Sequence, residues 1–513
     1  MSEHSPTAGL PIQPHSGKDD ALLGWALTGV AVGLVVLLLV AAPGKWQFAG
    51  ALAAVVALAL LALRRTKEVA LRLVAASMPF AGMNFFLGGV PAEYHPGGAQ
   101  RTLELSLTDL SLVPLLGVVI GEIATRRKRL YFGDLGNWLL LGFLGWAGVS
   151  LLHAPDAALG LAELFRLGKI FLIYVLMVHA TESVDHVKLV LRGLVIGAVG
   201  QAAFAAYQYH FGTPSFMYFV THGGEPMATE EFTTATAIRV GGLVGYPVDF
   251  AQYLLIMIPL ALWRVLVTRK PSWRVASTIP AGLCLLALVL THTRGAMLIA
   301  PLIAVAFVWL AAGALGWKGR LKILVAALLV LALIGVGLSG LVLLRFHEVQ
   351  GSSEARLNMW RVAISIISAN PLLGVGINNY ALVMHKYDAL GYINGYAYPV
   401  HNVFLFFAAE NGIPGLLLVG GFVALIYRRG WRLCQKLEPQ SAVAVLAMLV
   451  AFSGPLLYGQ IDQGFKYITT VWSLLWLMAG MISSLDLRLS ERPGKAGLLH
   501  HALIARESQS QPC

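Results

Sequence analysis

The sequence predicts an all-α, polytopic integral membrane bundle of about 12–14 transmembrane helices, with a large outer loop that contains an amphipathic helix. Of its 513 residues, 57% are hydrophobic and only 12% are charged, whereas soluble domains carry about 25% charged residues. The mean hydropathy is +0.72. The three cysteines are scattered and fit no disulfide or metal set. This composition excludes a soluble enzyme, a disordered chain and a secreted disulfide scaffold.

The apolar residues fall into runs that match membrane-crossing helices, which need about 20 residues each. The first run is too long for a cleaved signal peptide and lacks a small-residue cleavage site, so we interpret it as a signal anchor. The predicted spans are 22–42, 48–63, 69–88, 107–124, 136–153, 160–181, 188–208, 247–266, 276–292, 295–313, 321–343, 402–427, 441–458 and 467–485.

Clusters of Lys and Arg orient the bundle. Cytoplasmic loops of membrane proteins are enriched in these residues, so the net charge of +11 is better explained by orientation than by nucleic-acid binding. Both termini are predicted to be cytoplasmic, and the loops that are poor in clustered charge are predicted to lie on the outer side. The clusters are 64–67, 126–129, 269–270, 318–320 and 428–429.

This orientation divides the chain into alternating membrane and aqueous parts. Two cytoplasmic tails (1–21 and 486–513) enclose the transmembrane segments and the outer loops. The transmembrane segments are 22–208, 247–343 and 402–485, and the outer loops are 209–246 and 344–401.

A few cations lie on the outer side, against the general rule. Arg239 precedes a span, Arg294 lies in a very short Thr-Arg-Gly link, and His401 opens a later span. One interpretation is that each reaches lipid headgroups. The other is that together they form an anion site, because all are expected near one membrane depth.

Arg356 carries the most information among these cations. Residues 354–369 form an amphipathic pattern, with Arg356 inside the apolar stripe and Arg361 outside it. An arginine cannot discard its charge and needs an anionic partner. We therefore favour a ligand contact over a structural ion pair. At about 100° per residue, the stripe comprises Leu357, Trp360, Ala363, Ile364 and Ile367.

Other polar groups are candidates for substrate binding. The turn 371–376 could expose the N–H groups of Gly374 and Gly376 to an anion, or could be simple turn chemistry. Asn402 is a plausible N-cap of an outward-facing helix N-terminus. Asp249 either complements a helix dipole or pairs with an active-site cation. Arg166, which lies in an apolar run with Lys169, either binds substrate or lipid phosphate or pairs within the bundle.

The chain resembles the O-antigen ligase superfamily. Residues 401–415, HNVFLFFAAENGIPG, resemble its His-Asn signature followed by Gly-x-x-Gly. The upstream segments 356–360 and 371–376, and the Thr-Arg-Gly at 293–295, resemble further family motifs. The family includes O-antigen ligases, polysaccharide polymerases of the Wzy type and protein O-oligosaccharyltransferases, which these motifs do not separate.

The resemblance implies glycosyl transfer from an undecaprenyl-diphosphate-linked oligosaccharide at the periplasmic face, without cofactor, metal or nucleic acid. The acceptor would be a glycan or a lipid A core, as in lipopolysaccharide or exopolysaccharide synthesis. By motif match, His401 would be the catalytic histidine, and Arg294 and Arg356 would bind the diphosphate. A histidine suits removal of the acceptor's proton, and one displacement would invert the anomeric centre. The alternative is that His401 is a histidine that faces the lipid headgroups.

Two other hypotheses remain open. A transporter or flippase of polyprenyl-linked or other anionic substrates should carry charges near the midplane, whereas here they gather at one interface. A catalytically silent assembly partner would keep its role without His401. The sequence does not specify the sugar or the oligomeric state.

Overall fold

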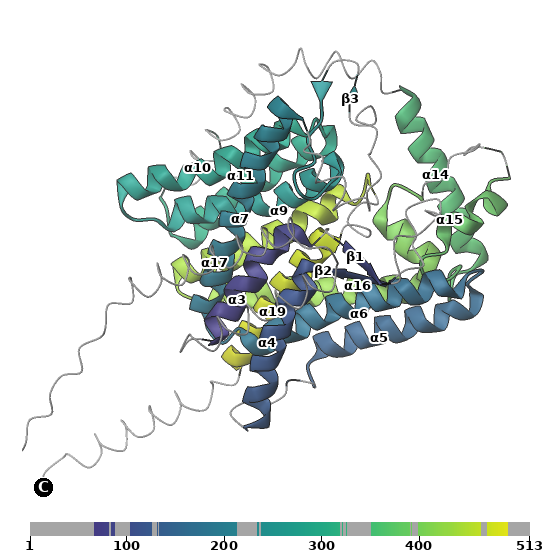
Figure 1. Cartoon of the computed structure of the whole chain (residues 1–513), viewed down its shortest axis with the longest axis horizontal. Helices are drawn as coiled ribbons and strands as arrows, with labels where there is room; N and C mark the ends of the chain where they lie inside the picture. The colour runs from purple at the N-terminus through teal and green to yellow at the C-terminus, as the bar shows by residue number, and fades with distance from the viewer. Residues whose placement is uncertain are drawn as a thin grey trace, which may run out of the picture.

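The computed structural model describes residues 66–81, 84–87, 103–125, 131, 133–212, 233–234, 237–318, 321, 325, 350–389, 391, 399–462 and 469–490. Within these residues the chain is mostly helical (Figure 1), and nine helices are long and apolar enough to cross a membrane. The predicted all-α, polytopic membrane fold is therefore confirmed. The predicted spans 22–42 and 48–63, and nearly all of 321–343, lie outside the described residues.

One predicted span is wrong. Helix α3 (Thr66–Ser77) is followed by the 3-10 turn η1 (Met78–Phe80), which contains Pro79, and then by strand β1 (Asn84–Leu87). Strand β1 pairs antiparallel with β2 (Leu103–Ser106). Proline lacks an N–H donor and interrupts a helix. The 12 residues of α3 span only about 18 Å, so the 69–88 run is not one transmembrane helix.

The next helices follow their predicted spans, and capping side chains set where they begin. Helix α4 occupies its predicted residues, and α5, α6 and α7 begin one to four residues before their predicted spans because a polar side chain satisfies the first N–H groups. The caps of α4 to α7 are Ser106, Asp134, Asp156 and Ser183. The elements are α4 (Leu107–Ala124), α5 (Leu135–Ser150), η3 (Leu151–His153), α6 (Ala157–Ala180) and α7 (Val184–Phe211).

The second half of the chain alternates long helices with a folded segment outside them. A short hairpin, β3 (Thr233–Thr234) with β4 (Ala237–Ile238), precedes α9. Proline occupies the first turn of α9, α10 and α17, where its missing N–H has no cost. The elements are α9 (Pro247–Val267), α10 (Pro271–Leu290), α11 (Arg294–Ala314), α14 (Gln350–Ala369), α15 (Tyr380–Val383), η5 (Met384–Tyr387), α16 (Val403–Lys436), α17 (Pro439–Tyr458) and α19 (Thr469–Ser490).

Helices α9, α17 and α19 form the centre of the bundle. Their most apolar stretches are 72%, 78% and 94% buried, whereas α10 is only 22% buried and presents most of its surface outward. Helix α17 packs on α9 and α11, and α16 packs on α5, α17 and α19. Helices α14 and α15 lie to one side of the bundle, away from α10 and α11 (Figure 1).

A buried ion cluster ties α5, α6, α16 and α19 together at one end. Asp134 accepts hydrogen bonds from Arg429 Nη1 at 3.0 Å and from the Tyr174 hydroxyl at 3.1 Å. Arg429 also lies 3.6 Å from Asp486, which pairs with Arg432. Asp134 and Arg429 are 7% and 5% exposed. Removing one member leaves a buried charge without its counterion, which costs about 3–5 kcal/mol.

We expect Asp134→Asn to lower the thermal unfolding midpoint of the purified protein by several degrees, because Arg429 loses its closest counterion. The measurement is thermal unfolding in detergent. The matched control is Asp185→Asn, which removes a pair with Lys188 at 3.6 Å whose carboxylate is 88% exposed. The control should leave the midpoint unchanged, and an equal loss in both variants would contradict the cluster's role.

Candidate functional site

The Thr-Arg-Gly link between α10 and α11 is held against Arg239. Arg239 donates from Nε to the Thr291 carbonyl at 3.1 Å and lies 3.5 Å from Thr293 Oγ1. Thr293 Oγ1 in turn donates to the Pro247 carbonyl at the start of α9. The structure thus brings Arg239 and the residue before Arg294 to the same place, at the first turns of α9 and α11. We call this end of the bundle the site end.

Tyr458, the last residue of α17, lies among the charges of the site end. Its side chain is 5% exposed, and it packs against Gly295 of the Thr-Arg-Gly motif. A Cβ on that glycine would lie 3.0 Å from the Tyr458 ring and 2.6 Å from the end of the Ile461 side chain, so a larger residue there would displace both side chains. The charged residues that act on the tyrosine electrostatically are Asp462, Arg356, Asp249 and Arg239.

His401 joins this group through the loop that follows α17. The Val403 N–H donates to the Gly459 carbonyl at 2.8 Å, and the Asn402 amide donates to the Gln460 carbonyl at 3.2 Å. These two bonds strap residues 459–462 to the start of α16. Asp462 and Arg356 then act electrostatically on His401.

The surroundings of His401 favour a neutral imidazole. Burial lowers the pKa of His401 below its ordinary value near 6.5, Asp462 partly opposes this, and the Arg356 charge lowers the pKa further. The ring atom Nδ1 lies 3.2 Å from the Pro399 carbonyl. A carbonyl only accepts, so this contact places the proton on Nδ1 and leaves the basic lone pair on Nε2. Such a histidine is suited to take up a proton.

Arg356 lies within electrostatic range of His401 because α14 packs on α16. Four side chains of α14, namely Met359, Val362, Ala363 and Ile366, are buried in a cluster that also contains Val400 and Phe406. The predicted stripe was therefore partly wrong. Leu357 and Ile364 are 54% and 52% exposed, because the helix turns a neighbouring face to the protein. Arg356 and Arg361 are both exposed, and Arg361 bonds to Asn358. The predicted contrast between an Arg356 inside the apolar stripe and a solvated Arg361 is therefore wrong, and Arg356 acts on His401 through its charge.

The turn 371–376 sits on a kink in α16. The Ile413 N–H donates to the Pro371 carbonyl at 2.8 Å, across a break where Gly412 has φ +68°. A Cβ on Gly412 would overlap the Leu372 carbonyl. The kink and the turn thus fit each other only if residue 412 is glycine.

Two predicted backbone donors turn out to be used by the fold. The N–H groups of Gly374 and Gly376 donate to the carbonyls of Asn370 and Glu410 at 3.0 and 3.1 Å, so the prediction that they face an anion is wrong. The physical reason is that the kink exposes carbonyls of α16, and the turn satisfies them.

Asn402 is the N-cap that we predicted, and it leaves the helix few donors for a ligand. Its side chain accepts from the N–H groups of Phe404 and Leu405 at 3.0 and 3.1 Å. The Val403 N–H already bonds to Gly459. The start of α16 therefore contributes its dipole to the site end, and its first N–H groups serve the fold.

The remaining predicted residues divide into two groups. Asp249, in the first turn of α9, lies within electrostatic range of Asp462 and belongs to the site end. Arg166 is 8% exposed and donates from Nε to Glu163 at 2.8 Å on its own helix. Lys169 pairs with Asp109 at 2.7 Å. For these two cations the structure shows the alternative that we left open, pairing within the bundle.

Tyr458 and Asp462 were missed by the sequence analysis. The only signal is a tyrosine at the outer end of the 441–458 run, followed four residues later by a carboxylate. That pattern alone is common at helix ends. Their importance follows from the strap to α16, which connects residues far apart in the sequence.

An apolar cavity of about 300 Å³ lies along α16. Its lining includes Val403 and Phe404 before the kink at Gly412 and residues up to Ala424 after it. Trp472 and Trp476 of α19 close one wall and Phe452 of α17 another. A charged group at the site end and an apolar chain in this cavity could belong to one amphiphilic ligand.

We expect Gly412→Ala to destabilise the protein by at least about 2 kcal/mol, because the positive φ disfavours a side chain and the new Cβ would overlap the Leu372 carbonyl. The measurement is the thermal unfolding midpoint in detergent. Gly420→Ala on the same helix is the control. Its Cβ meets no atom within 4 Å, and alanine favours a helix by about 1 kcal/mol. A loss confined to the control would contradict the fit of turn and kink.

The fold and the site end define a multi-pass membrane protein with a cationic, histidine-containing site at one end of its helices. Residues 279–420 match the family described as O-antigen ligase, which confirms the resemblance to the O-antigen ligase superfamily. The matched segment contains Arg294, Arg356 and His401, whereas Tyr458 and Asp462 lie beyond it. The chain is accordingly a membrane enzyme of the ligase or polymerase type in surface glycan synthesis. No curated protein matches it.

Proposed function

We propose that this protein transfers or polymerises an undecaprenyl-diphosphate-linked glycan at the periplasmic face of the bacterial inner membrane, by a metal-independent, inverting displacement. The observation that carries the proposal is one cluster at the site end. It joins His401, whose pKa is lowered by burial, to the charges of Arg356 and Asp462 around Tyr458, and the helix that begins just after His401 lines an apolar cavity.

The residues of the cluster fit the steps of such a displacement. The acceptor hydroxyl oxygen attacks the anomeric carbon, and the bond from that carbon to the diphosphate oxygen breaks. His401 Nε2 takes the hydroxyl proton. The electron pair leaves with the lipid diphosphate, whose growing charge is stabilised by Arg356 and Arg294, with Arg239 behind the Thr-Arg-Gly link. Asp462 stabilises the imidazolium as it forms.

The apolar cavity supports a lipid-linked donor. A diphosphate held by arginines at the site end would place the polyprenyl chain at Val403 and Phe404, which line the cavity. Aromatic and aliphatic walls can bury the first part of the chain, and burial of each CH₂ stabilises binding by about 0.8 kcal/mol. The rest of the chain would remain in the bilayer.

The distribution of charge supports a periplasmic site. Arg269, Lys270 and Arg429 lie at the opposite ends of α9, α10 and α16 from the site end. Clustered cations mark the cytoplasmic side. The site end is then periplasmic, where lipid-linked glycans are assembled onto acceptors.

Reconstitution with a lipid-linked oligosaccharide tests the proposal. We expect His401→Ala to lower the transfer rate at least 100-fold, because a positioned general base contributes about 10²–10⁴-fold. Arg356→Ala should also abolish most transfer. The matched control is Arg361→Ala on the same helix, which removes an exposed cation bonded to Asn358 and should keep the rate.

The products separate the alternatives. Transfer to a lipid A core identifies a ligase, and a ladder on the carrier lipid identifies a polymerase. If the lipid crosses the membrane of sealed vesicles and no new glycosidic bond forms, the protein is a transporter and the proposed enzyme activity is rejected. Full transfer by His401→Ala would remove the histidine from the mechanism.

The pH dependence of kcat/KM should report the lowered pKa of His401. The base must be neutral, so activity should be constant at neutral pH and fall as the pH drops through a value below about 6.5. Asp462→Asn should move this midpoint to lower pH, because the carboxylate raises the histidine's pKa. Glu354→Gln, which removes an exposed acid on α14, should not move it. A wild-type midpoint above 6.5 would contradict the burial of the base.

A further inference from the structure

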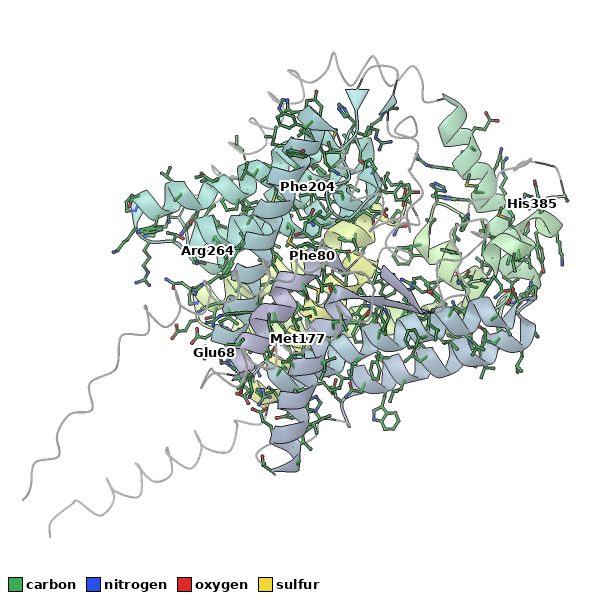
Figure 2. The ribbon with its side chains drawn as sticks, viewed as in Figure 1. Glu68, Phe80, Met177, Phe204, Arg264 and His385 are labelled. Atoms are coloured by element: carbon green, nitrogen blue, oxygen red, sulfur yellow. The ribbon has the colours of Figure 1, made fainter. Side chains whose placement is uncertain are left out.

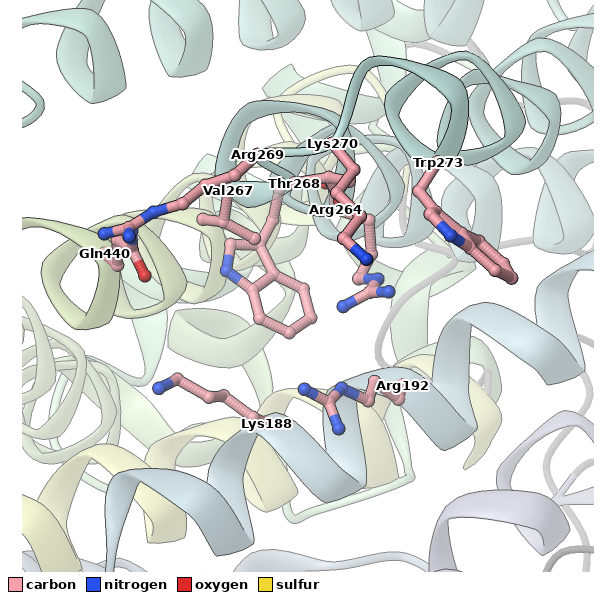
Figure 3. Close-up of a pocket in the computed structure, with 10 residues that line it drawn as sticks. Lys188, Arg192, Arg264, Val267, Thr268, Arg269, Lys270, Trp273 and Gln440 are labelled. Atoms are coloured by element: carbon pink, nitrogen blue, oxygen red, sulfur yellow. The ribbon is translucent and has the colours of Figure 1, made fainter. Parts of the chain in front are cut away.

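A second polar cavity lies at the other end of the bundle. It measures about 360 Å³ and is formed by the start of α7, the end of α9, the α9–α10 turn and the start of α17 (Figure 3). Helix α9 carries Asp249 at the site end and Arg264 at this cavity, 15 residues or about 22 Å apart along the axis. Figure 2 shows Arg264 on the far side of the molecule from His385. We call this cavity the basic pocket.

Five cations line the basic pocket, and no described lining residue is acidic. Two come from consecutive turns of α7, and three come from the end of α9 and the turn after it. In Figure 3 the side chains of Arg264 and Arg192 face each other across the cavity, and the two guanidinium groups act on one another electrostatically. The cations are Lys188, Arg192, Arg264, Arg269 and Lys270.

The neighbours of these cations do not neutralise the pocket. Lys188 lies 3.6 Å from Asp185, but that carboxylate is 88% exposed and outside the lining. Arg269 has a neutral partner. With the Gln440 amide oriented to satisfy both groups, its oxygen accepts from Arg269 at 2.9 and 2.7 Å. Like charges held together in a partly buried cavity repel, so a bound anion would stabilise this arrangement.

Trp263 helps to hold one of these cations at the cavity. The side chain is 1% exposed and lines the pocket. The Arg264 guanidinium lies 5.8 Å from the centre of its ring, and an aromatic face attracts a cation. An oxyanion in the pocket would supply the negative charge that the guanidinium groups lack.

The surroundings indicate a membrane lipid as the source of the anion. Helix α10, which begins at the pocket, has 22% of its apolar stretch buried, so most of its surface faces the bilayer. Trp273 in its first turn is 66% exposed and also lines the pocket, as expected of an anchor at the membrane interface. Basic pockets between transmembrane helices bind headgroups of this kind.

We propose that the basic pocket binds a phosphate-bearing headgroup of an anionic membrane lipid, at the end of the bundle remote from the candidate active site. Arginine side chains bind phosphate through paired N–H donors, and the N-termini of α10 and α17 add their dipoles. A soluble diphosphate shares the chemistry of the headgroup and is the alternative source.

Native mass spectrometry of the full-length protein in detergent tests the proposal, with cardiolipin, phosphatidylcholine and inorganic diphosphate as separate probes. We expect cardiolipin to bind at least tenfold more tightly than phosphatidylcholine. Arg192→Gln and Arg264→Gln should each weaken cardiolipin binding about tenfold, or about 1.4 kcal/mol.

The matched control is Arg428→Gln. Arg428 is an exposed cation of α16 at the same end of the bundle and outside the lining, so its loss should leave binding unchanged. An equal loss in the control, or equal binding of the two lipids, would overturn the site. Saturable binding of diphosphate without preference for cardiolipin would overturn the lipid source and leave a soluble anion as the ligand.

Discussion

Helix α16 breaks at Gly412, and the turn 371–376 fills the break. The carbonyls freed by the kink accept from Val375 and Gly376, and the Pro371 carbonyl accepts from Ile413. This exchange of backbone hydrogen bonds holds α14 against the first half of α16. Arg356 and His401 lie on those two helical elements, so their relative position depends on the break. A straight α16 would satisfy its own carbonyls and leave the turn without partners.

Charges at the two ends of the bundle are handled in different ways. At one end, Asp134 and Asp486 pair with the buried Arg429, and Asp486 also pairs with Arg432, whose side chain is 43% exposed. At the site end, Arg239, Arg356 and His401 share two nearby carboxylates and the partly buried surface around Tyr458. The first arrangement pairs its cations with carboxylates of the fold. The second keeps cations where they can interact with a ligand.

The sequence predicts the helices well because long apolar runs have few alternatives in a membrane. Residues 107–124 form a helix with the predicted bounds. The 69–88 run misled the prediction because apolar composition does not reveal the turn that Pro79 begins. On α14, periodicity gives the direction of an apolar face only approximately, and Leu357 and Ile364 proved to be exposed. The role of the Gly376 N–H could not be assigned because its acceptor, the Glu410 carbonyl, lies far along the chain.

The strap from Gly459 and Gln460 to the start of α16 also has a consequence for biosynthesis. The segment that matches the O-antigen ligase family ends at residue 420. Tyr458 is the last residue of α17, and Asp462 follows that helix. During synthesis, a nascent chain that has already inserted Arg294, Arg356 and His401 still lacks the surroundings that hold His401 in place. The surroundings of His401 are therefore completed only when α17 and the residues after it have joined the bundle.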